Sequence, residues 1–156
     1  MMVKNSIILE IEKLLNSKKI LDYNILSDSF GINCLKIETD DKERYIVKYY
    51  YKKESKFNAI KSEADNILFL NIHKFNFFPK IINNSNKFLI MSFIDNNNHL
   101  PIKTNDDLLG AIISLHSKRS NDYGFNFDTQ IGGLKQSNSN SKSWVEFYRD
   151  KRLHYI

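Results

Sequence analysis

Hydrophobic and polar residues alternate along Arg44–Tyr50, and this alternation predicts a β-strand. Ile46 and Lys48 would share one face of that strand. From residue 56 to residue 70, apolar residues recur every three or four positions, which predicts an amphipathic helix with Glu63 on its apolar face. Because an unpaired buried charge costs a large free energy, we expect the Lys48 ammonium group to pair with the Glu63 carboxylate.

The expected pair of Lys48 and Glu63 has two interpretations. A strand lysine paired with a helix glutamate holds nucleotide phosphates in kinases. Alternatively, the lysine lies at a sheet edge and the glutamate extends to the rim of the buried stripe, in which case neither side chain binds a ligand. The two positions alone leave both interpretations open.

The pattern along the rest of the chain predicts further strands and helices. Strands are expected at Asp22–Leu26, Cys34–Thr39, Lys80–Ile82 and Lys87–Ile94, with turns at Ser27–Gly31, Asp40–Glu43 and Asn83–Asn86. Helices are expected at Ile7–Leu15, at Asp106–Ser117 and from Ser143 to Ile156. Residues 120–142 are polar and rich in glycine, serine and asparagine, so we expect a long loop there.

Composition narrows the class of protein. The chain has 156 residues, of which 42% are hydrophobic and 13% aromatic, and this content is typical of a folded domain rather than a disordered chain. Cys34 is the single cysteine, so no disulfide can form within the chain and a reducing compartment is expected. The apolar run Ile7–Leu9 is too short for a signal peptide or a membrane span. We therefore expect a cytoplasmic protein without a membrane partner.

The charge of the chain does not indicate a nucleic-acid partner. The net charge is +5, but the basic residues are scattered as pairs such as Lys18–Lys19 and Lys151–Arg152. No basic helix interleaved with aromatic residues and no nucleic-acid-binding motif occurs. His73, His99 and His154 lack the spacing of metal ligands, so no metal site is expected from them.

Spaced motifs along the chain form an ordered series. Those of the N-terminal part are Ser29–Asn33, Ile46-Val47-Lys48, Glu63-Ala64 and Leu89–Ile94. Those that follow are Leu109-Gly110, Leu115-His116, Tyr123-Gly124-Phe125, Ile131-Gly132-Gly133, Gln136, Asn138, Trp144, Phe147-Tyr148 and Arg152-Leu153. The first group suits any kinase-like fold, whereas the second is specific. Together they resemble the fructosamine kinase (ketosamine kinase) family, within the aminoglycoside and choline phosphotransferase-like kinases, over nearly the whole chain.

The resemblance implies an α+β fold that corresponds to the N-terminal half of that family. Residues 1–95 would form a protein-kinase-like N-lobe, an antiparallel sheet of about five strands with a helix packed on it. Residues 96–156 would form the linker and the first helices of an incomplete C-lobe. The family reaction would be the ATP-dependent phosphorylation of a sugar hydroxyl on a ketosamine adduct, which frees the amine and so deglycates proteins.

The resemblance also implies which residues bind ATP. These residues are Lys48, Glu63, Gly31, Ile32, Asn33, Ile46, Met91, Ser92, Phe93 and Ile94. Lys48 would hold the phosphates and Glu63 would orient Lys48. The loop Ser29–Asn33 would cover the phosphates. Met91–Ile94 would form the hinge beside the adenine, through the Ser92 carbonyl and the Ile94 amide.

The chain departs from the family at the phosphate loop and at the catalytic loop. The family loop carries two or three consecutive glycines, whereas Ser29 and Phe30 precede Gly31 here, so a stiffer loop is expected. Ser92 stands where the family commonly has glutamate. No His-Gly-Asp sequence occurs. The catalytic aspartate and the Mg²⁺ ligands that the family has in and after that loop are therefore missing as well. We therefore expect no catalytic residue, no metal ligand and no turnover by this chain alone.

Two alternatives to this hypothesis remain. The chain could be a non-catalytic remnant that binds nucleotide, or a fragment completed by a dimer partner or by a complementing C-terminal half. It could also be a relative of the aminoglycoside or choline kinases. The motifs from Gln136 to Arg152 argue against that second alternative.

Overall fold

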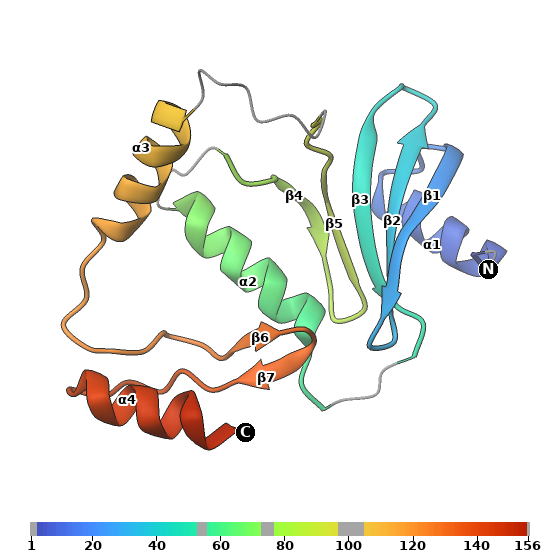
Figure 1. Ribbon diagram of the computed structural model, residues 1–156. Coiled ribbons are helices and arrows are strands. Elements are labelled where there is room, and N and C mark those ends of the chain that lie inside the picture. The colour runs from blue at the N-terminus through green and yellow to red at the C-terminus, as the bar shows by residue number, and fades with distance from the viewer. Residues whose placement is uncertain (1–2, 53–55, 73–76, 97–104, 156) are drawn as a thin grey trace. The chain divides into compact units, whose positions relative to one another are not determined.

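The computed structural model describes residues 3–52, 56–72, 77–96 and 105–155 (Figure 1). The chain divides into two compact units, Met1–Ile94 and Asp95–Ile156, which we call the first and second units and describe separately. Within the described ranges, no helix has the length and apolar character that crossing a membrane requires.

The first unit is built around a five-stranded antiparallel sheet (Figure 1). In spatial order its strands are β1 (Ile20–Ser29), β2 (Ile32–Thr39), β3 (Arg44–Tyr50), β5 (Phe88–Ser92) and β4 (Ile81–Asn84). Its helices are α1 (Asn5–Leu14) and α2 (Ala59–Ile72). The predicted α+β architecture with five strands and a helix packed on the sheet is therefore confirmed.

The alternation along β3 separates the two faces of the sheet. Tyr45, Val47 and Tyr49 are buried in a cluster that includes Ile11 of α1, and we call this side the α1 face. Ile46 packs in a second cluster with the buried side chains of α2, on the side that we call the α2 face. The sheet is thus covered on both sides, whereas the sequence predicted a single helix on it.

Strand β5 is buried on both faces, as its continuous apolar run predicts. Phe88 and Ile90 belong to the α1-face cluster, and Leu89 and Met91 belong to the α2-face cluster. The strand is shorter than predicted by one residue at its start and two at its end, because it begins at Phe88 and regular pairing ends at Ser92.

The hairpin of β1 and β2 corrects the predicted turn at residues 27–31. Strand β1 extends to Ser29, which lies opposite Ile32, so the turn contains only Phe30 and Gly31. Both residues have positive φ angles, 51° and 71°, as in the two-residue turns that suit the twist of a hairpin. Pairing with β2 along the whole strand outweighs the turn preference of Ser27–Ser29.

The second unit contains α3 (Asn105–His116), β6 (Thr129–Ile131), β7 (Leu134–Gln136) and α4 (Trp144–Lys151), followed by a short 3₁₀ turn at Leu153–Tyr155. The prediction of a structureless loop over residues 120–142 was wrong, because β6 and β7 form a hairpin there. Gly132 and Gly133 make its turn with φ angles of 54° and 83°. Strands of three residues are too short to produce a recognisable alternation.

The last helix is shorter than the predicted range of residues 143–156. Ser143 caps it by accepting a hydrogen bond from the amide of Glu146 at 3.4 Å, and the helix ends at Lys151. Arg152 then leaves the helix, and Ile156 lies outside the described residues.

Candidate functional site

The predicted pairing of Lys48 with Glu63 is present in the structure. The Lys48 Nζ lies 2.6 Å from Oε1 of Glu63, and the two side chains are 28% and 24% exposed. The pair is therefore shielded by its neighbours but still open to solvent. An ammonium group has three donors, so Lys48 retains the capacity to bind an anion while it holds the carboxylate.

The sheet and the start of α2 set the position of this ion pair. Lys48 lies on β3 between Cys34 of β2 and Leu89 of β5. The amide of Ala59, the first residue of α2, donates to the Tyr50 hydroxyl at 2.9 Å, which ties the helix to the end of β3. Glu63 follows one turn later, so it reaches Lys48 across the α2 face.

The N-terminal end of α2 is capped as well as tethered. The Oδ1 of Asn58 accepts a hydrogen bond from the amide of Lys61 at 3.0 Å, which satisfies a free donor at the helix start. Sequence analysis did not recognise Asn58 or Tyr50, although an asparagine immediately before an apolar helix is a typical cap.

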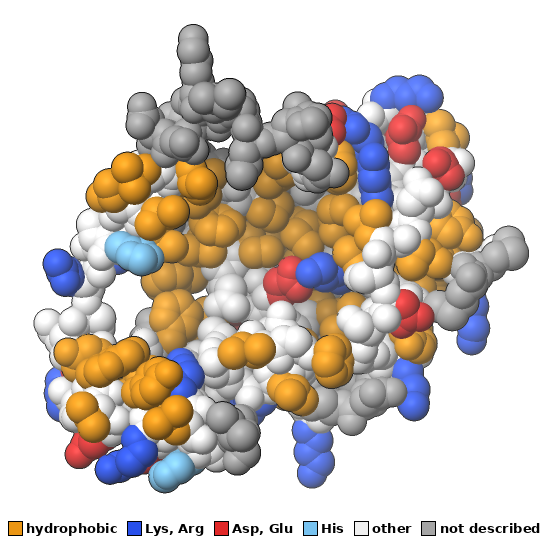
Figure 2. Space-filling model, viewed as in Figure 1, with side chains coloured by type: hydrophobic (Ala, Val, Ile, Leu, Met, Phe, Trp, Pro, Cys, Tyr) orange, Lys and Arg blue, Asp and Glu red, His pale blue; other side chains and the backbone are white. Residues whose placement is uncertain are grey.

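Hydrophobic side chains surround the ion pair. Ile32, Ile46 and Met91, which the resemblance implies at the site, all belong to the α2-face cluster. Figure 2 shows an acidic and a basic side chain in contact within a broad area of hydrophobic side chains. A charged pair beside an apolar surface can accommodate a ligand that has a charged part and a flat apolar part.

Asn33 does not join these residues through its side chain. It is 1% exposed, and its Nδ2 donates to the Tyr49 hydroxyl at 3.0 Å on the α1 face. Its neighbour Cys34 is the residue that lies opposite Lys48. A contact between Asn33 and a ligand on the α2 face would therefore involve only its backbone.

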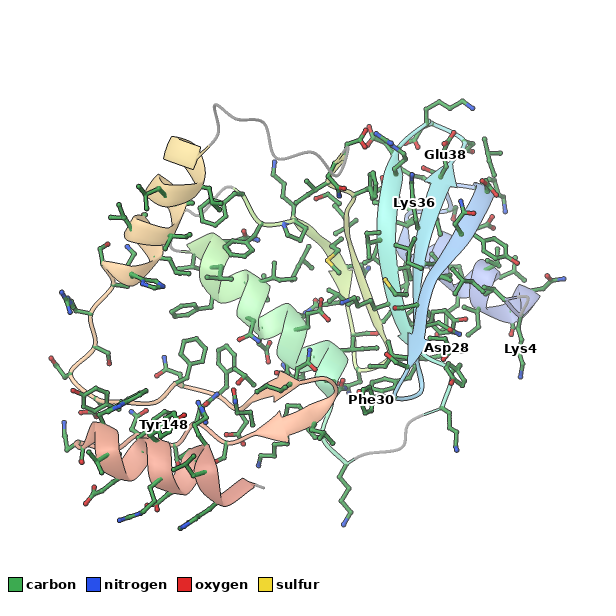
Figure 3. All side chains as sticks on the ribbon, viewed as in Figure 1. Lys4, Asp28, Phe30, Lys36, Glu38 and Tyr148 are labelled. Atoms are coloured by element: carbon green, nitrogen blue, oxygen red, sulfur yellow. The ribbon has the colours of Figure 1, made fainter. Side chains whose placement is uncertain are left out.

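The loop implied to cover the phosphates is the two-residue turn of the first hairpin. Gly31 makes that turn together with Phe30, a residue that is 55% exposed at the tip (Figure 3). A residue with a Cβ in the left-handed region restricts the backbone more than glycine does. The stiffer loop expected from the missing glycines stays a prediction.

The hinge residues extend from the end of β5. The amide of Ser92 donates to the Lys80 carbonyl at 2.9 Å, and its hydroxyl accepts from the Lys80 amide at 3.0 Å. The amide of Phe93 donates to the Arg44 carbonyl at 3.2 Å, which continues the pairing of β3 and β5 by one residue. Ile94 follows and is 48% exposed.

Cys34 is a half-buried thiol opposite Lys48. Burial raises the pKa of this thiol, and the nearby Lys48 ammonium only partly opposes that effect. The thiol form therefore dominates at neutral pH, as expected of a small packing residue.

Two further cations on the α2 face were missed by the sequence analysis. Lys36 lies on β2 opposite Ile46, and Arg44 begins β3. Both contact the ring of Phe93. The alternation of β2 could have placed Lys36 on the same face as Cys34, but its contact with Phe93 depends on strand pairing.

The second unit contains a polar clasp, by which we mean Asn138 and Arg152. Asn138 is 3% exposed, and its Oδ1 accepts a hydrogen bond from Arg152 Nη2 at 2.6 Å. Its Nδ2 donates to the Phe127 carbonyl at 3.2 Å and to the Thr129 hydroxyl at 2.8 Å. The clasp thus joins the hairpin to the end of α4.

Metal-binding groups do not gather in the part of the chain that the structure describes. No three histidine, cysteine, aspartate or glutamate side chains come together there in a way that could hold a metal ion.

Comparison with known proteins gives the family. The profile of the family described as fructosamine kinase matches residues 9–156. The chain belongs to the fructosamine kinase family. Members of this family are ATP-dependent ketosamine kinases.

The chloroplastic protein-ribulosamine 3-kinase of Arabidopsis thaliana is a curated relative of this chain. It is 38% identical over 71 residues, which are 44% of this chain and 21% of the relative.

Solved structures share the fold. The chain aligns with proteins designated fructosamine-3-kinase from Thermobifida fusca (TM-score 0.75, 18% identity) and Haemophilus somnus (TM-score 0.76, 21% identity), covering 96% of this chain and 52% and 51% of theirs. The streptomycin-ATP-APH(2″)-IIa ternary complex aligns over 77% of this chain and 42% of that one, with a TM-score of 0.59 and 22% identity. This fructosamine kinase family member therefore spans about half the length of the solved structures it matches.

Proposed function

We propose that the first unit binds ATP on its α2 face and serves as the nucleotide-binding part of a ketosamine kinase. The observation that carries this proposal is the 2.6 Å ion pair of Lys48 and Glu63 beside an apolar surface. A strand lysine held by a helix glutamate is the device with which kinases bind nucleotide phosphates. Membership of an ATP-dependent family supports the same proposal.

Each part of the site has a role in this proposal. Lys48 holds the phosphates and Glu63 fixes the Lys48 ammonium group. Ile46 and Met91 lie against the adenine, while the Ser92 carbonyl and the Ile94 amide bind its edge. Gly31 and the backbone of its neighbours approach the phosphates. The Mg²⁺ ion that the family uses would arrive with the nucleotide, because the sequence lacks the His-Gly-Asp loop whose surroundings supply the ligands.

The reaction that this site would serve is the phosphorylation of a sugar hydroxyl on a ketosamine. We propose that the 156 residues bind nucleotide but do not transfer phosphate alone, since no His-Gly-Asp sequence is present to accept the hydroxyl proton. A complementing C-terminal half would supply the missing groups, whereas a second copy of this sequence would lack them as well. A purely nucleotide-binding role is the alternative, and it shares the same binding step.

Titration with ATP and Mg²⁺, followed by thermal shift, tests the nucleotide site. Bound ATP should raise the melting temperature, because a ligand that binds only the folded state stabilises it. Lys48→Met should weaken ATP binding about tenfold or more, since it removes a charge-assisted contact to phosphate. Lys61→Met is the matched control, because Lys61 pairs with Asp65 on α2 and is 57% exposed. The proposal would be refuted if millimolar ATP raised the melting temperature of neither the parent nor Lys48→Met.

Release of ADP in the presence of a ketosamine tests the second part. The chain alone should produce no ADP above the background without enzyme. Ketosamine-dependent ADP formation by the purified chain would show that it carries its own catalytic groups, and would overturn the proposed need for a complementing part.

A further inference from the structure

Two cations flank the aromatic ring that follows β5. The Nζ of Lys36 lies 4.4 Å from the centroid of the Phe93 ring, and the Cζ of Arg44 lies 4.9 Å from the same centroid. Contacts of this kind attract a cation to the face of the ring. All three side chains are partly buried, so the contacts are not those of freely mobile surface groups.

Strand pairing explains why these three side chains meet. The hydrogen bond from the Phe93 amide to the Arg44 carbonyl places Phe93 opposite Arg44. Lys36 lies opposite Ile46, two residues along β3 from Arg44, and therefore on the same α2 face. To reach Phe93, the Lys36 side chain must cross β3 from β2. In Figure 3, Lys36 lies well along β2 from Phe30, which marks the tip of the first hairpin.

The ring of Phe93 is thus held from two strands at once. Lys36 contacts it from β2 and Arg44 from β3, whereas Phe93 itself continues β5. Because Phe93 lies between Ser92 and Ile94, fixing its ring also fixes the direction of the two backbone groups proposed to bind the base. Long cationic side chains lose freedom when they do this, so the contact has a cost that a purely solvated lysine would avoid.

We infer that Lys36 and Arg44 are positioning residues that hold the hinge in the conformation which selects adenine over guanine. The inference rests on the proposed nucleotide site. Adenine presents an amino donor where guanine presents a carbonyl acceptor. A hinge with a fixed carbonyl and a fixed amide therefore accepts adenine and opposes guanine, whereas a loosely held hinge discriminates less.

The test measures the dissociation constants of ATP, GTP and inorganic tripolyphosphate for the full chain and its variants. Lys36→Met should weaken ATP binding about two- to fivefold, the range of one cation–π contact, and lower the preference for ATP over GTP by the same factor. Lys36→Arg, which keeps a cation on the ring, should restore the preference. Tripolyphosphate has no base, so its binding should follow only the change in charge.

Lys42→Met is the matched control for charge. It removes a cation from the turn between β2 and β3, where the Lys42 side chain is 74% exposed and lies 3.6 Å from Glu38. It should change tripolyphosphate binding as Lys36→Met does and leave the ATP to GTP preference unaltered. In a Phe93→Leu background, Lys36→Met should have no further effect on that preference, because the ring it contacts is absent.

The outcomes separate the inference from the proposal beneath it. If the parent binds ATP, Lys48→Met weakens that binding, and Lys36→Met leaves the ATP to GTP preference at the parental value, the inference alone is overturned. Equal affinity of the parent for ATP and GTP would also overturn it alone. If the parent binds neither ATP nor tripolyphosphate, the proposed function and the inference both fail. Circular dichroism melts of each variant confirm that it is folded.

Discussion

The two units of the chain bury different kinds of side chain. In the first unit, Leu35, Val47, Leu89 and Ile90 are fully buried between the sheet and its helices. Among the described side chains of the second unit, the buried ones are Phe147 and the polar Asn138, 6% and 3% exposed. One unit thus rests on apolar contacts, and the other on a buried hydrogen-bond network around one aromatic ring.

This difference determines how each unit should respond to substitution. Apolar packing is distributed over many contacts and has little directional preference. A hydrogen-bond network is directional, and the loss of one partner leaves the others buried without a partner. The clasp also keeps the Arg152 guanidinium over the ring of Phe147, 4.6 Å from its centroid, so the polar and aromatic parts support each other.

The largest expected effect is the loss of a buried leucine from the sheet. Leu35→Ala should lower the free energy of unfolding by about 2–5 kcal/mol, because it leaves a cavity in the α1-face cluster. Urea denaturation followed by circular dichroism measures this change. Leu21→Ala, on the same sheet but 57% exposed, should cost no more than about 0.5 kcal/mol. Similar losses for both variants would show that the described burial does not stabilise the first unit.

A smaller but more local effect is expected at the clasp. Asn138→Ala should destabilise the second unit by about 1–3 kcal/mol, because the Arg152 guanidinium and the Thr129 hydroxyl each lose one hydrogen bond at a buried site. Trp144 is the single tryptophan, so its fluorescence reports on α4 during urea denaturation. The exposed Asn126 provides the control variant Asn126→Ala. An unchanged Trp144 transition in Asn138→Ala would contradict the role given to the clasp.

The smallest effect concerns a buried carboxylate in the first unit. Glu12 is 8% exposed, and its carboxylate accepts hydrogen bonds from Lys19 Nζ at 2.9 Å and from the Ile20 amide at 3.0 Å. These hydrogen bonds, led by that of Lys19, lower the pKa of the Glu12 carboxyl below 4.5. Glu12→Gln should cost about 1 kcal/mol at neutral pH.

The destabilisation by Glu12→Gln should depend on pH, in a direction that follows from the lowered pKa of Glu12. A carboxyl whose pKa is lower in the folded state stabilises the protein fully above the usual value of 4.5, and that contribution disappears as the pH falls through the folded value. The difference between parent and Glu12→Gln should therefore shrink as the pH is lowered from 7 to about 3. Glu10→Gln, which breaks an exposed pair with Lys87, is the control on the same helix. A difference that grew on acidification would have the wrong sign.

Much of the first unit was predictable because its signals are local. The alternation of β3 and the spacing of α2 record which side chains face apolar neighbours, and Lys48 and Glu63 stand out as the charged exceptions. Their pairing followed from the cost of burying either one alone. The face of the sheet on which the Asn33 side chain lies was harder to predict, because it depends on the register of β2 against β3.

The second unit was less predictable for the same physical reason. The strands of the 129–136 hairpin contain three residues each, too few for a pattern, and their turn was visible only as two glycines in a polar segment. Asn138 and Arg152 were recognisable as motif residues, but 14 positions separate them, and no local rule states that they bond.

Residues and periodicity were thus sufficient to predict the sheet of the first unit, a helix packed on it and the pair of Lys48 and Glu63, since burial repeats with the period of the strand or helix. That a helix also covers the other face of the sheet emerged only from the structure. The meeting of Lys36 with Phe93, the face to which Asn33 turns and the clasp of Asn138 with Arg152 appear only in the folded chain. Each depends on which distant backbone lies alongside, and strand register and long-range hydrogen bonds are set by the packing of the whole unit.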